Sequence, residues 1–315
     1  MKGSRKRALR LYRLRVVLLG TAAGGGFPQW NCWCPICRTG RSEPHRAFPR
    51  SQSSAAVSAD GERWFLLNAS PDVRDQLSCL PGPSGTALRH TPIEGILTTD
   101  AELDHTLGIT LLREARSLQL YLTPPVRSIL ERDSRIVPVT EAFAQVVVTE
   151  MMLDHRTPLR YRDAQPSGIS IEAFAVPAGP PRFATTSEVG HTVGFMIEDA
   201  STGGSCAFVP GCGDLDQPLL ERLGQADLLL FDGTFWSDDE LIALGISDRR
   251  ARDMDHLPVS GPDGSLTQLA RISGPQKLYT HINNTNPMLL EDSAERAAVD
   301  RAGLTVASDG MSFTV

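Results

Sequence analysis

The feature that most constrains this chain is a recurring pattern in which a short apolar run ends in polar residues. Residues 95–99 and 227–231 are runs of this kind, and residues 277–281 are a further strand-like segment that itself ends in polar residues. A continuous apolar run of this length, bounded by polar residues, is typical of a buried strand. Loops at strand ends are where proteins place binding and catalytic residues. The pattern therefore predicts an α/β protein whose functional residues follow its strands.

The expected elements extend over most of the sequence. Strands are expected at residues 16–20, 55–58, 63–68, 95–99, 169–176, 192–198, 206–209, 227–231 and 277–281, and helices at 106–115, 265–272 and 293–302. Residues 305–315 are expected to form a hairpin that turns at Asp309 and Gly310. Because no repeat or linker-like boundary interrupts the chain, we expect one domain over residues 15–315, preceded by a basic N-terminal extension, residues 1–14.

Composition narrows the class of partner. The 315 residues are 41% hydrophobic and 22% charged, as in ordinary globular proteins, and the net charge of −6 offers no basic surface for a nucleic acid. No apolar run approaches the roughly 18 residues that span a bilayer, and residues 16–19 are too short for a signal-peptide core. We therefore expect a cytoplasmic protein with a small or peptide-derived ligand, no nucleic-acid partner and no stable membrane insertion.

Three of the six cysteines lie close together, at Cys32, Cys34 and Cys37. This spacing does not suit ordinary disulfides in a chain of this length, whereas thiolates so placed can surround one tetrahedral Zn²⁺. The alternative is a group of free thiols. We predict a structural zinc whose fourth ligand comes from elsewhere. Because such a loop lies at the surface, we also expect it to help form a homodimer.

A second set of candidate ligands follows two of the expected strands. Asp104 and His105 lie beyond residues 95–99, and His281 ends residues 277–281. An Asp-His pair before a helix can also be a simple helix cap. The prediction therefore rests on the order in which all the candidate ligands occur along the chain. Two histidines and a carboxylate with open positions are typical of non-haem Fe(II) oxygenases. We therefore expect Fe²⁺ or another divalent metal here.

These segments resemble the metal-binding pattern of metallo-β-lactamase-fold enzymes. Those enzymes carry His-x-His-x-Asp-His after such a strand, and here Asp100 and Glu102 replace the first two histidines. Residues 188–195 resemble the segment that supplies a third ligand, and both Glu188 and His191 are candidates for that role.

Later segments continue the resemblance. Gly211 stands where a metal-bridging aspartate is usual, and Asp214 is out of register with it. The segments around Asp232 and His256 resemble the phosphodiesterase branch, which makes both residues catalytic candidates and His256 a proton donor. The same branch has a histidine where this chain has Asn284, which is therefore a candidate fourth zinc ligand.

Longer strings identify a narrower resemblance. Residues 24–32, 50–54, 68–72 and 281–287 resemble the pyrroloquinoline quinone (PQQ) biosynthesis protein B family, and the similarity covers most of the chain. It implies a four-layer αββα sandwich and a part in making PQQ from a peptide-derived precursor.

The resemblance also implies an activity, which is iron-dependent hydroxylation, with O₂, of the tyrosine ring in a Glu-Tyr-derived intermediate. An alternative within the same family is a non-catalytic carrier of PQQ or its precursor towards the periplasm. A hydrolase of the phosphodiesterase branch is a third alternative. It would use two metal ions to activate water, and the replacements at Asp100, Glu102 and Gly211 argue against it.

Overall fold

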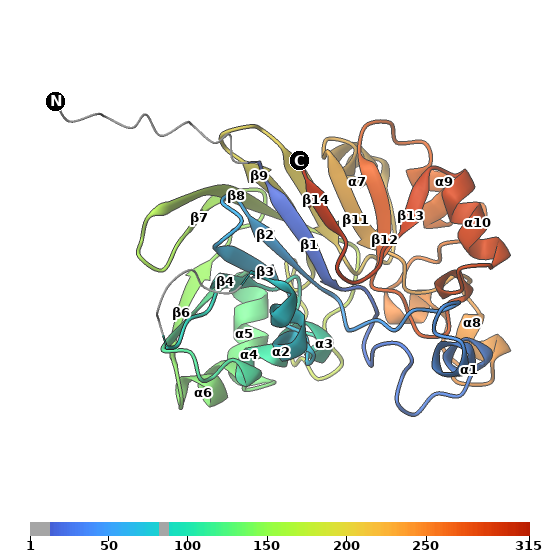
Figure 1. Cartoon of the computed structure of the whole chain (residues 1–315), viewed down its shortest axis with the longest axis horizontal. Coiled ribbons are helices and arrows are strands. Elements are labelled where there is room, and N and C mark those ends of the chain that lie inside the picture. The colour runs from blue at the N-terminus through green and yellow to red at the C-terminus, as the bar shows by residue number, and fades with distance from the viewer. Residues whose placement is uncertain (1–12, 82–87) are drawn as a thin grey trace.

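The computed structural model describes residues 13–81 and 88–315, and its strands form two seven-stranded sheets (Figure 1). The first sheet has the order β14 (Ser312–Thr314), β1 (Arg15–Gly20), β2 (Ser54–Ser58), β3 (Trp64–Leu67), β4 (Ile93–Leu97), β5 (Ser117–Leu122) and β6 (Gln145–Glu150). The second has the order β13 (Leu304–Val306), β12 (Gln276–Thr280), β11 (Leu228–Asp232), β10 (Ser205–Val209), β9 (Val193–Asp199), β8 (Pro166–Ala175) and β7 (Arg156–Arg160).

Each sheet combines an antiparallel and a parallel half. Strands β3 to β6 run parallel in the first sheet, and β10 to β13 run parallel in the second. Parallel strands have their carboxyl ends at one edge of a sheet, and ligands commonly bind outside those ends. The polar residues that follow β4, β11 and β12 are therefore placed where a site can form.

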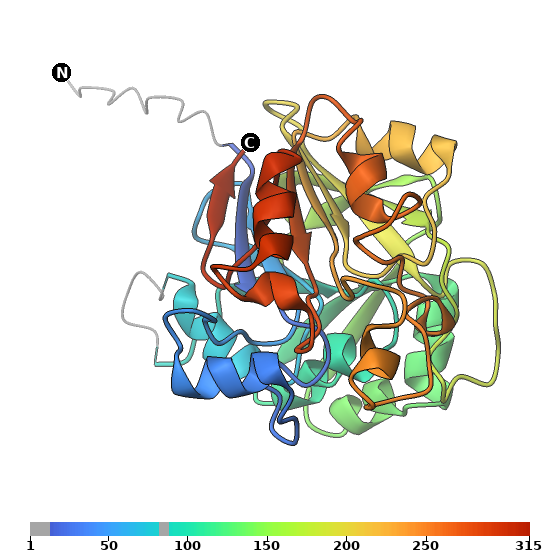
Figure 2. The same ribbon diagram turned by 90° about the vertical axis from the view of Figure 1, so that its right-hand side faces the viewer.

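Helices cover the outer faces of both sheets (Figures 1 and 2). The α-helices are α1 (Pro35–Ser42), α2 (Val73–Gln76), α3 (Leu103–Thr106), α4 (Gly108–Leu111), α5 (Pro124–Arg132), α6 (Ile136–Glu141), α7 (Gln217–Leu223), α8 (Glu240–Ala243), α9 (Ser265–Leu269) and α10 (Ala294–Arg301), and the 3₁₀ turns are η1 (Leu77–Cys79), η2 (Arg252–Met254) and η3 (Pro287–Leu289). Apolar residues of α2 and α4 to α6 pack on the first sheet. Those of α1, α7, α9 and α10 pack on the second. The four-layer αββα prediction is thus confirmed.

The inner faces of the sheets form the central core. Phe65 and Leu97 of the first sheet cluster with Phe195, Phe208 and Leu230 of the second, and all five are buried. Burying a side chain of this size contributes about 1.5–3 kcal/mol. Because the two sheets are packed together in this way, the strand ends from which the edge loops begin are held in fixed positions.

One sequence prediction about the last strands is wrong. Residues 305–315 do not form a hairpin, because β13 pairs with β12 whereas β14 pairs with β1 of the other sheet. The intervening Asp309 accepts hydrogen bonds from the backbone N–H of Ser51 and the hydroxyl of Thr21, both at 2.7 Å. These contacts anchor the chain where it crosses between sheets.

The helix predicted for residues 106–115 is also wrong in its extent. Two short helices, α3 and α4, occupy residues 103–111 instead. At Gly108 the backbone N–H donates to Ala69 at 2.9 Å, and a Cβ would lie 2.2 Å from the carbonyl oxygen of Ser70. This close approach requires glycine at a position that joins the two helices.

Most of the predicted N-terminal extension lies outside the described residues, which begin at Arg13. Leu14 was predicted to belong to that extension, but its side chain is buried and its carbonyl accepts a hydrogen bond from Val315 at 3.0 Å. The folded domain therefore includes Leu14. Within residues 13–81 and 88–315, none of the helices has the length and apolar character needed to cross a bilayer.

Candidate metal centres and active site

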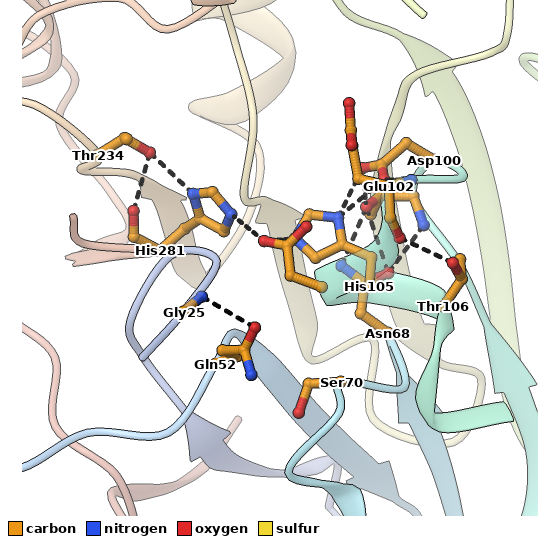
Figure 3. A network of polar contacts seen from close by, with 12 residues as sticks. Gly25, Gln52, Asn68, Ser70, Asp100, Glu102, His105, Thr106, Thr234 and His281 are labelled. Carbon is orange, nitrogen blue, oxygen red and sulfur yellow. Dashed lines mark hydrogen bonds and ion pairs between the residues drawn. The ribbon is translucent and has the colours of Figure 1, made fainter. Parts of the chain in front are cut away.

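Two segments that follow strands bring the second set of predicted ligands together. Asp104 and His105 lie on α3, which follows β4, and His281 comes directly after β12. His281 has a φ of 54°, a left-handed conformation that is uncommon for residues other than glycine and clusters at functional sites. Figure 3 shows His105 and His281 facing each other although they are distant in sequence.

These three side chains form a compact group of ligand atoms. Asp104 Oδ2 lies 3.3 Å from His281 Nε2 and 3.8 Å from His105 Nε2. The two imidazole rings meet edge to face, with centroids 5.1 Å apart. All three ligand atoms lie within 4.8 Å of one another, a spacing that one metal ion can bridge.

Partners outside the group orient both imidazoles (Figure 3). His105 Nδ1 contacts the two carboxylate oxygens of Asp100 at 2.9 and 2.8 Å, and His281 Nδ1 lies 2.8 Å from Thr234 Oγ1. With each Nδ1–H donating outward, each Nε2 presents its lone pair to the group. Ligating histidines are usually held in this way, by a hydrogen bond from the nitrogen that does not bind the metal.

The residues present fit a divalent metal ion. His105 Nε2 is buried and has no hydrogen-bond partner among the described residues, which is unusual for a buried polar atom. Burial alone lowers the pKa of His105, but Asp100 and Asp104 outweigh burial and raise it to about 9. Burial alone raises the pKa of Asp104, but His105 and His281 hold it well below its usual range. The surroundings therefore favour positive charge at this place, which a metal cation can supply.

His256 stands beside this group and is positioned by Asp232. Asp232 Oδ2 lies 2.7 Å from His256 Nδ1 and accepts from the Cys212 backbone at 3.0 Å, while Oδ1 accepts from the Thr234 hydroxyl at 2.6 Å. Burial opposes the effect, but Asp232 raises the pKa of His256. The rings of His256 and His281 stack with centroids 5.4 Å apart.

Asp232 is best described as a positioning residue. Its ligand atoms also lie within 4.8 Å of His256 and His281, but its side chain is fully buried and its oxygens accept four hydrogen bonds, the fourth from the Thr234 backbone at 3.0 Å. Such a carboxylate has little capacity left for a metal. His256 is the member of the pair that lines the pocket.

The structure does not bring Glu188 to the histidines. Its side chain is exposed and lines a neighbouring pocket, on the loop before β9, rather than the pocket that contains His105 and His281. His191, the competing candidate, is held by backbone carbonyls, with Nε2 3.0 Å from Ala178 O and Nδ1 against Glu188 O. Gly211 lines the active-site pocket without a side chain, whereas the Asp214 carboxylate accepts from the Leu215 backbone at 2.9 Å.

The histidines open into a pocket of about 600 Å³. Glu102 lies on its wall, where burial and the charges of Asp100 and Asp104 raise the pKa of Glu102 to about 7. Sequence reasoning missed Thr234 and two arginines, Arg182 and Arg249, which also line the pocket. For Thr234, proximity to Asp232 was a usable signal. The arginines lie in loops whose positions no local pattern reveals.

The cysteines form a separate cluster at the start of α1. The sulfur atoms of Cys32, Cys34 and Cys37 lie within 4.8 Å of one another, and Cys34 Sγ caps the helix by accepting from the Cys37 backbone at 3.4 Å. Asn284 Nδ2 donates to Cys37 Sγ at 3.2 Å. The neighbouring Cys34 thiol, against the effect of burial, lowers the pKa of Cys37 to about 5. The donor set fits a thiolate zinc site.

Asn284 lies beside the cysteines, as predicted, but its amide nitrogen faces Cys37. Its backbone oxygen lies 3.8 Å from Cys34 Sγ and 3.6 Å from Cys37 Sγ. Since an amide binds metals through oxygen, ligation by the Asn284 side chain requires a turned amide. Its role as fourth ligand stays a prediction.

The sequence of this chain is similar to a known protein family and to curated relatives. Residues 63–282 match the family model described as a β-lactamase superfamily domain. A coenzyme PQQ synthesis protein B from Rhodopseudomonas palustris (strain TIE-1) is 41% identical, and the match covers 96% of this chain and 100% of the relative. One from Methylobacterium nodulans is 42% identical over 95% of this chain and 99% of the relative.

Solved structures agree with these matches. The crystal structure of a Zn²⁺-bound protein, PqqB from Methylobacterium extorquens, is 39% identical and superposes with a TM-score of 0.85, covering 96% of this chain and 100% of that one. A diphosphatase from the PhnP family has a TM-score of 0.64 at 19% identity, covering 96% of this chain and 97% of that one. The second likeness shows the fold alone.

Proposed function

This chain belongs to the coenzyme PQQ synthesis protein B family within the β-lactamase superfamily, and on that premise we propose that it is an iron-dependent enzyme of PQQ synthesis. Its proposed reaction is hydroxylation, with O₂, of the tyrosine ring in a Glu-Tyr-derived precursor. The observation that carries the proposal is the group formed by Asp104, His105 and His281 in the wall of a pocket. Two histidines and one carboxylate with open positions are the donor set of Fe(II) oxygenases.

The reaction balances with one external reductant. One oxygen atom of O₂ replaces a ring hydrogen as a hydroxyl group, and the other leaves as water, with two protons and two electrons consumed. Asp104, His105 and His281 would hold the Fe²⁺, which would supply the redox chemistry for O₂. The protein's own contribution is to hold that metal, to orient the phenol and to move protons.

A chain of hydrogen bonds connects the proposed metal ligand His281 to His256. His281 Nδ1 donates to Thr234 Oγ1 at 2.8 Å, Thr234 donates to Asp232 at 2.6 Å, and Asp232 accepts from His256 Nδ1 at 2.7 Å. This arrangement fixes His256 with Nε2 as the atom left to exchange a proton with the substrate. General acid–base help of this kind is worth about 10² to 10⁴-fold in rate.

The two alternatives lack comparable support. A dinuclear hydrolase needs a second set of ligands, but Asp100 is engaged by His105, Asp232 by four hydrogen bonds, and Gly211 has no side chain. A carrier only binds and releases its ligand, which requires neither a catalytic metal nor an oriented histidine that exchanges a proton. Both alternatives are outcomes of the test below.

Incubation with ¹⁸O₂ tests the proposal. Iron-loaded protein, a Glu-Tyr-derived diacid and a reductant are expected to yield product whose tyrosine-derived ring carries ¹⁸O, measured by mass spectrometry. A matched sample in H₂¹⁸O with ordinary O₂ controls for exchange. A product cleaved without O₂ would indicate a hydrolase, and binding without any product would indicate a carrier. Absence of label with fully iron-loaded protein would reject the oxygenase.

A further inference from the structure

Two arginines stand at the active-site pocket on separate loops. Arg182 lies between β8 and β9, and Arg249 lies between β11 and η2, close to His256 in sequence. Both line the pocket that contains the histidines. Neither belongs to the proposed metal group or to the hydrogen bonds that orient it.

Both guanidinium groups lack a carboxylate partner within the part of the chain that the structure describes. Arg249 Nη2 donates to the backbone oxygen of Asp253, which fixes the side chain without neutralising it. Arg182 forms no side-chain hydrogen bond or close ion pair with a described residue. Its charge acts only from a longer distance on Glu102, where burial raises the pKa of the carboxyl and Arg182 partly offsets that rise. By contrast, arginines on other faces pair with acids, as Arg127 does with Glu131 and Arg222 with Asp154, each at 2.7 Å.

This lack of pairing is notable because the pocket is acidic. Asp100, Glu102, Asp104 and Asp255 all line it, yet none forms an ion pair with either arginine. An anionic ligand in such a pocket would be repelled unless cationic groups faced it. Positive side chains that have no close carboxylate contact in these surroundings are available to a ligand.

The remaining wall suits an aromatic ring. Phe183, Phe235 and Met254 line the pocket, and the ring of Phe235 meets that of His256 edge to face with centroids 5.9 Å apart. Large apolar side chains of this kind bind ring systems, while a few polar groups set their orientation. The pocket thus combines an apolar wall, a metal group and two cationic groups.

We infer that Arg182 and Arg249 bind two separate carboxylates of the substrate and so select an aromatic compound that carries at least two carboxylates. This inference rests on the proposed function, because it names what the same pocket recognises. A guanidinium binds a carboxylate through two parallel hydrogen bonds, which supply orientation as well as affinity. An ammonium group cannot reproduce that geometry, so lysine is an incomplete replacement.

Calorimetric binding tests the inference without turnover. The probes are N-acetyl-Glu-Tyr, which has two carboxylates, and N-acetyl-Gln-Tyr amide, which has none, each titrated into the full-length protein with its metals as purified. Arg182→Gln and Arg249→Gln are each expected to raise the Kd of the diacid about tenfold, equivalent to ~1.4 kcal/mol, and to leave that of the amide unchanged. Arg182→Lys is expected to lose less affinity than Arg182→Gln.

Arg252→Gln is the matched control, since Arg252 is exposed near Arg249 in sequence and does not line the pocket. Wild-type protein that did not prefer the diacid would overturn the inference. So would arginine variants that bound the diacid normally, or that lost both probes equally with a lowered melting temperature. If the arginine variants lose affinity only for the diacid but ¹⁸O never enters the ring, carboxylate recognition by the arginines is supported and the oxygenase reaction is rejected.

Discussion

The cysteine cluster and the histidine cluster are both groups of three potential ligands, but their surroundings differ. Cys34 and Cys37 are buried, and their polar neighbours are the amide of Asn284 and the guanidinium of Arg41, which donates to Cys32 O at 2.6 Å. The histidines instead have a carboxylate or hydroxyl behind each ring and an oriented third histidine beside them.

This difference separates a stabilising role from a chemical one. Thiolates bind soft cations tightly and, when they close the coordination sphere, hold chain segments together. Histidine and carboxylate ligands that open into a pocket leave positions for substrate and accept several divalent ions. The same chain thus has two candidate metal sites, and we expect them to respond in opposite ways to substitution.

Removing a ligand from the open group should have the largest effect. His105→Ala or His281→Ala is expected to abolish substrate oxygenation, because the remaining ligands cannot retain the metal. Zinc content and melting temperature should stay near those of wild type, as measured by elemental analysis and calorimetry. His155→Ala, at an exposed histidine elsewhere, is the control. Loss of the cysteine zinc in these variants would contradict the separation of the two sites.

Substituting the histidine beside the metal group should have a smaller effect. His256→Ala is expected to retain most of the iron but to lower kcat by about 10² to 10⁴-fold, the usual value of general acid–base help. Single-turnover kinetics with metal analysis of the same sample measures both quantities. Equal losses of iron and rate would instead make His256 a ligand.

The cysteine cluster should govern stability rather than rate. Cys34→Ser is expected to release zinc and to lower the free energy of unfolding by more than the ~3 kcal/mol of ordinary substitutions, since loss of a metal is among the few mechanisms with larger effects. Denaturant titration measures this, with Cys79→Ser at an exposed, isolated cysteine as control. Unchanged zinc and stability would leave three free thiols as the better description.

Replacing a residue that orients a ligand should reduce metal affinity less than replacing the ligand itself. Asp100→Asn removes the carboxylate that orients His105, and it is expected to weaken metal binding at the open group by about 10–100-fold. Competition with a chelator measures the affinity, and Asp300→Asn on α10 is the control. In both variants the chelator should remove the zinc of the cysteine cluster after the metal of the histidine group. Its earlier loss would reverse the assignment of the two sites.

The smallest expected effect concerns assembly. Trp30 precedes the cysteines and Trp33 lies between Cys32 and Cys34, with exposed fractions of 82% and 62%. Exposed apolar surface of this kind often marks an interface. We propose that it contributes to a homodimer, so that Trp30→Glu should shift the mass in light scattering towards that of a monomer. Val189→Glu, at an exposed apolar residue elsewhere, should not. A monomeric wild-type protein would refute the dimer.

Much of the fold and of both clusters could be predicted from local patterns. Mainly apolar segments predicted the positions of β10, β11 and β12 to within two residues, because strands buried on both faces are largely apolar. The sequence could not predict that β13 pairs with β12 and β14 with β1, since the two segments look alike locally. Long-range contacts such as those of Asp309 assign them to different sheets.

For the sites, the sequence by itself determined which kinds of ligand atom were available and that they followed strand ends. Only the tertiary structure decided which acids face the metal group. Asp100 and Asp104 are four residues apart, yet Asp100 lies behind His105 while Asp104 lies between the two histidines. Glu188 lies elsewhere, and Arg182 and Arg249 join the pocket from separate loops. The reason is that residue type sets a side chain's chemistry, whereas backbone direction and long-range packing set where that side chain points.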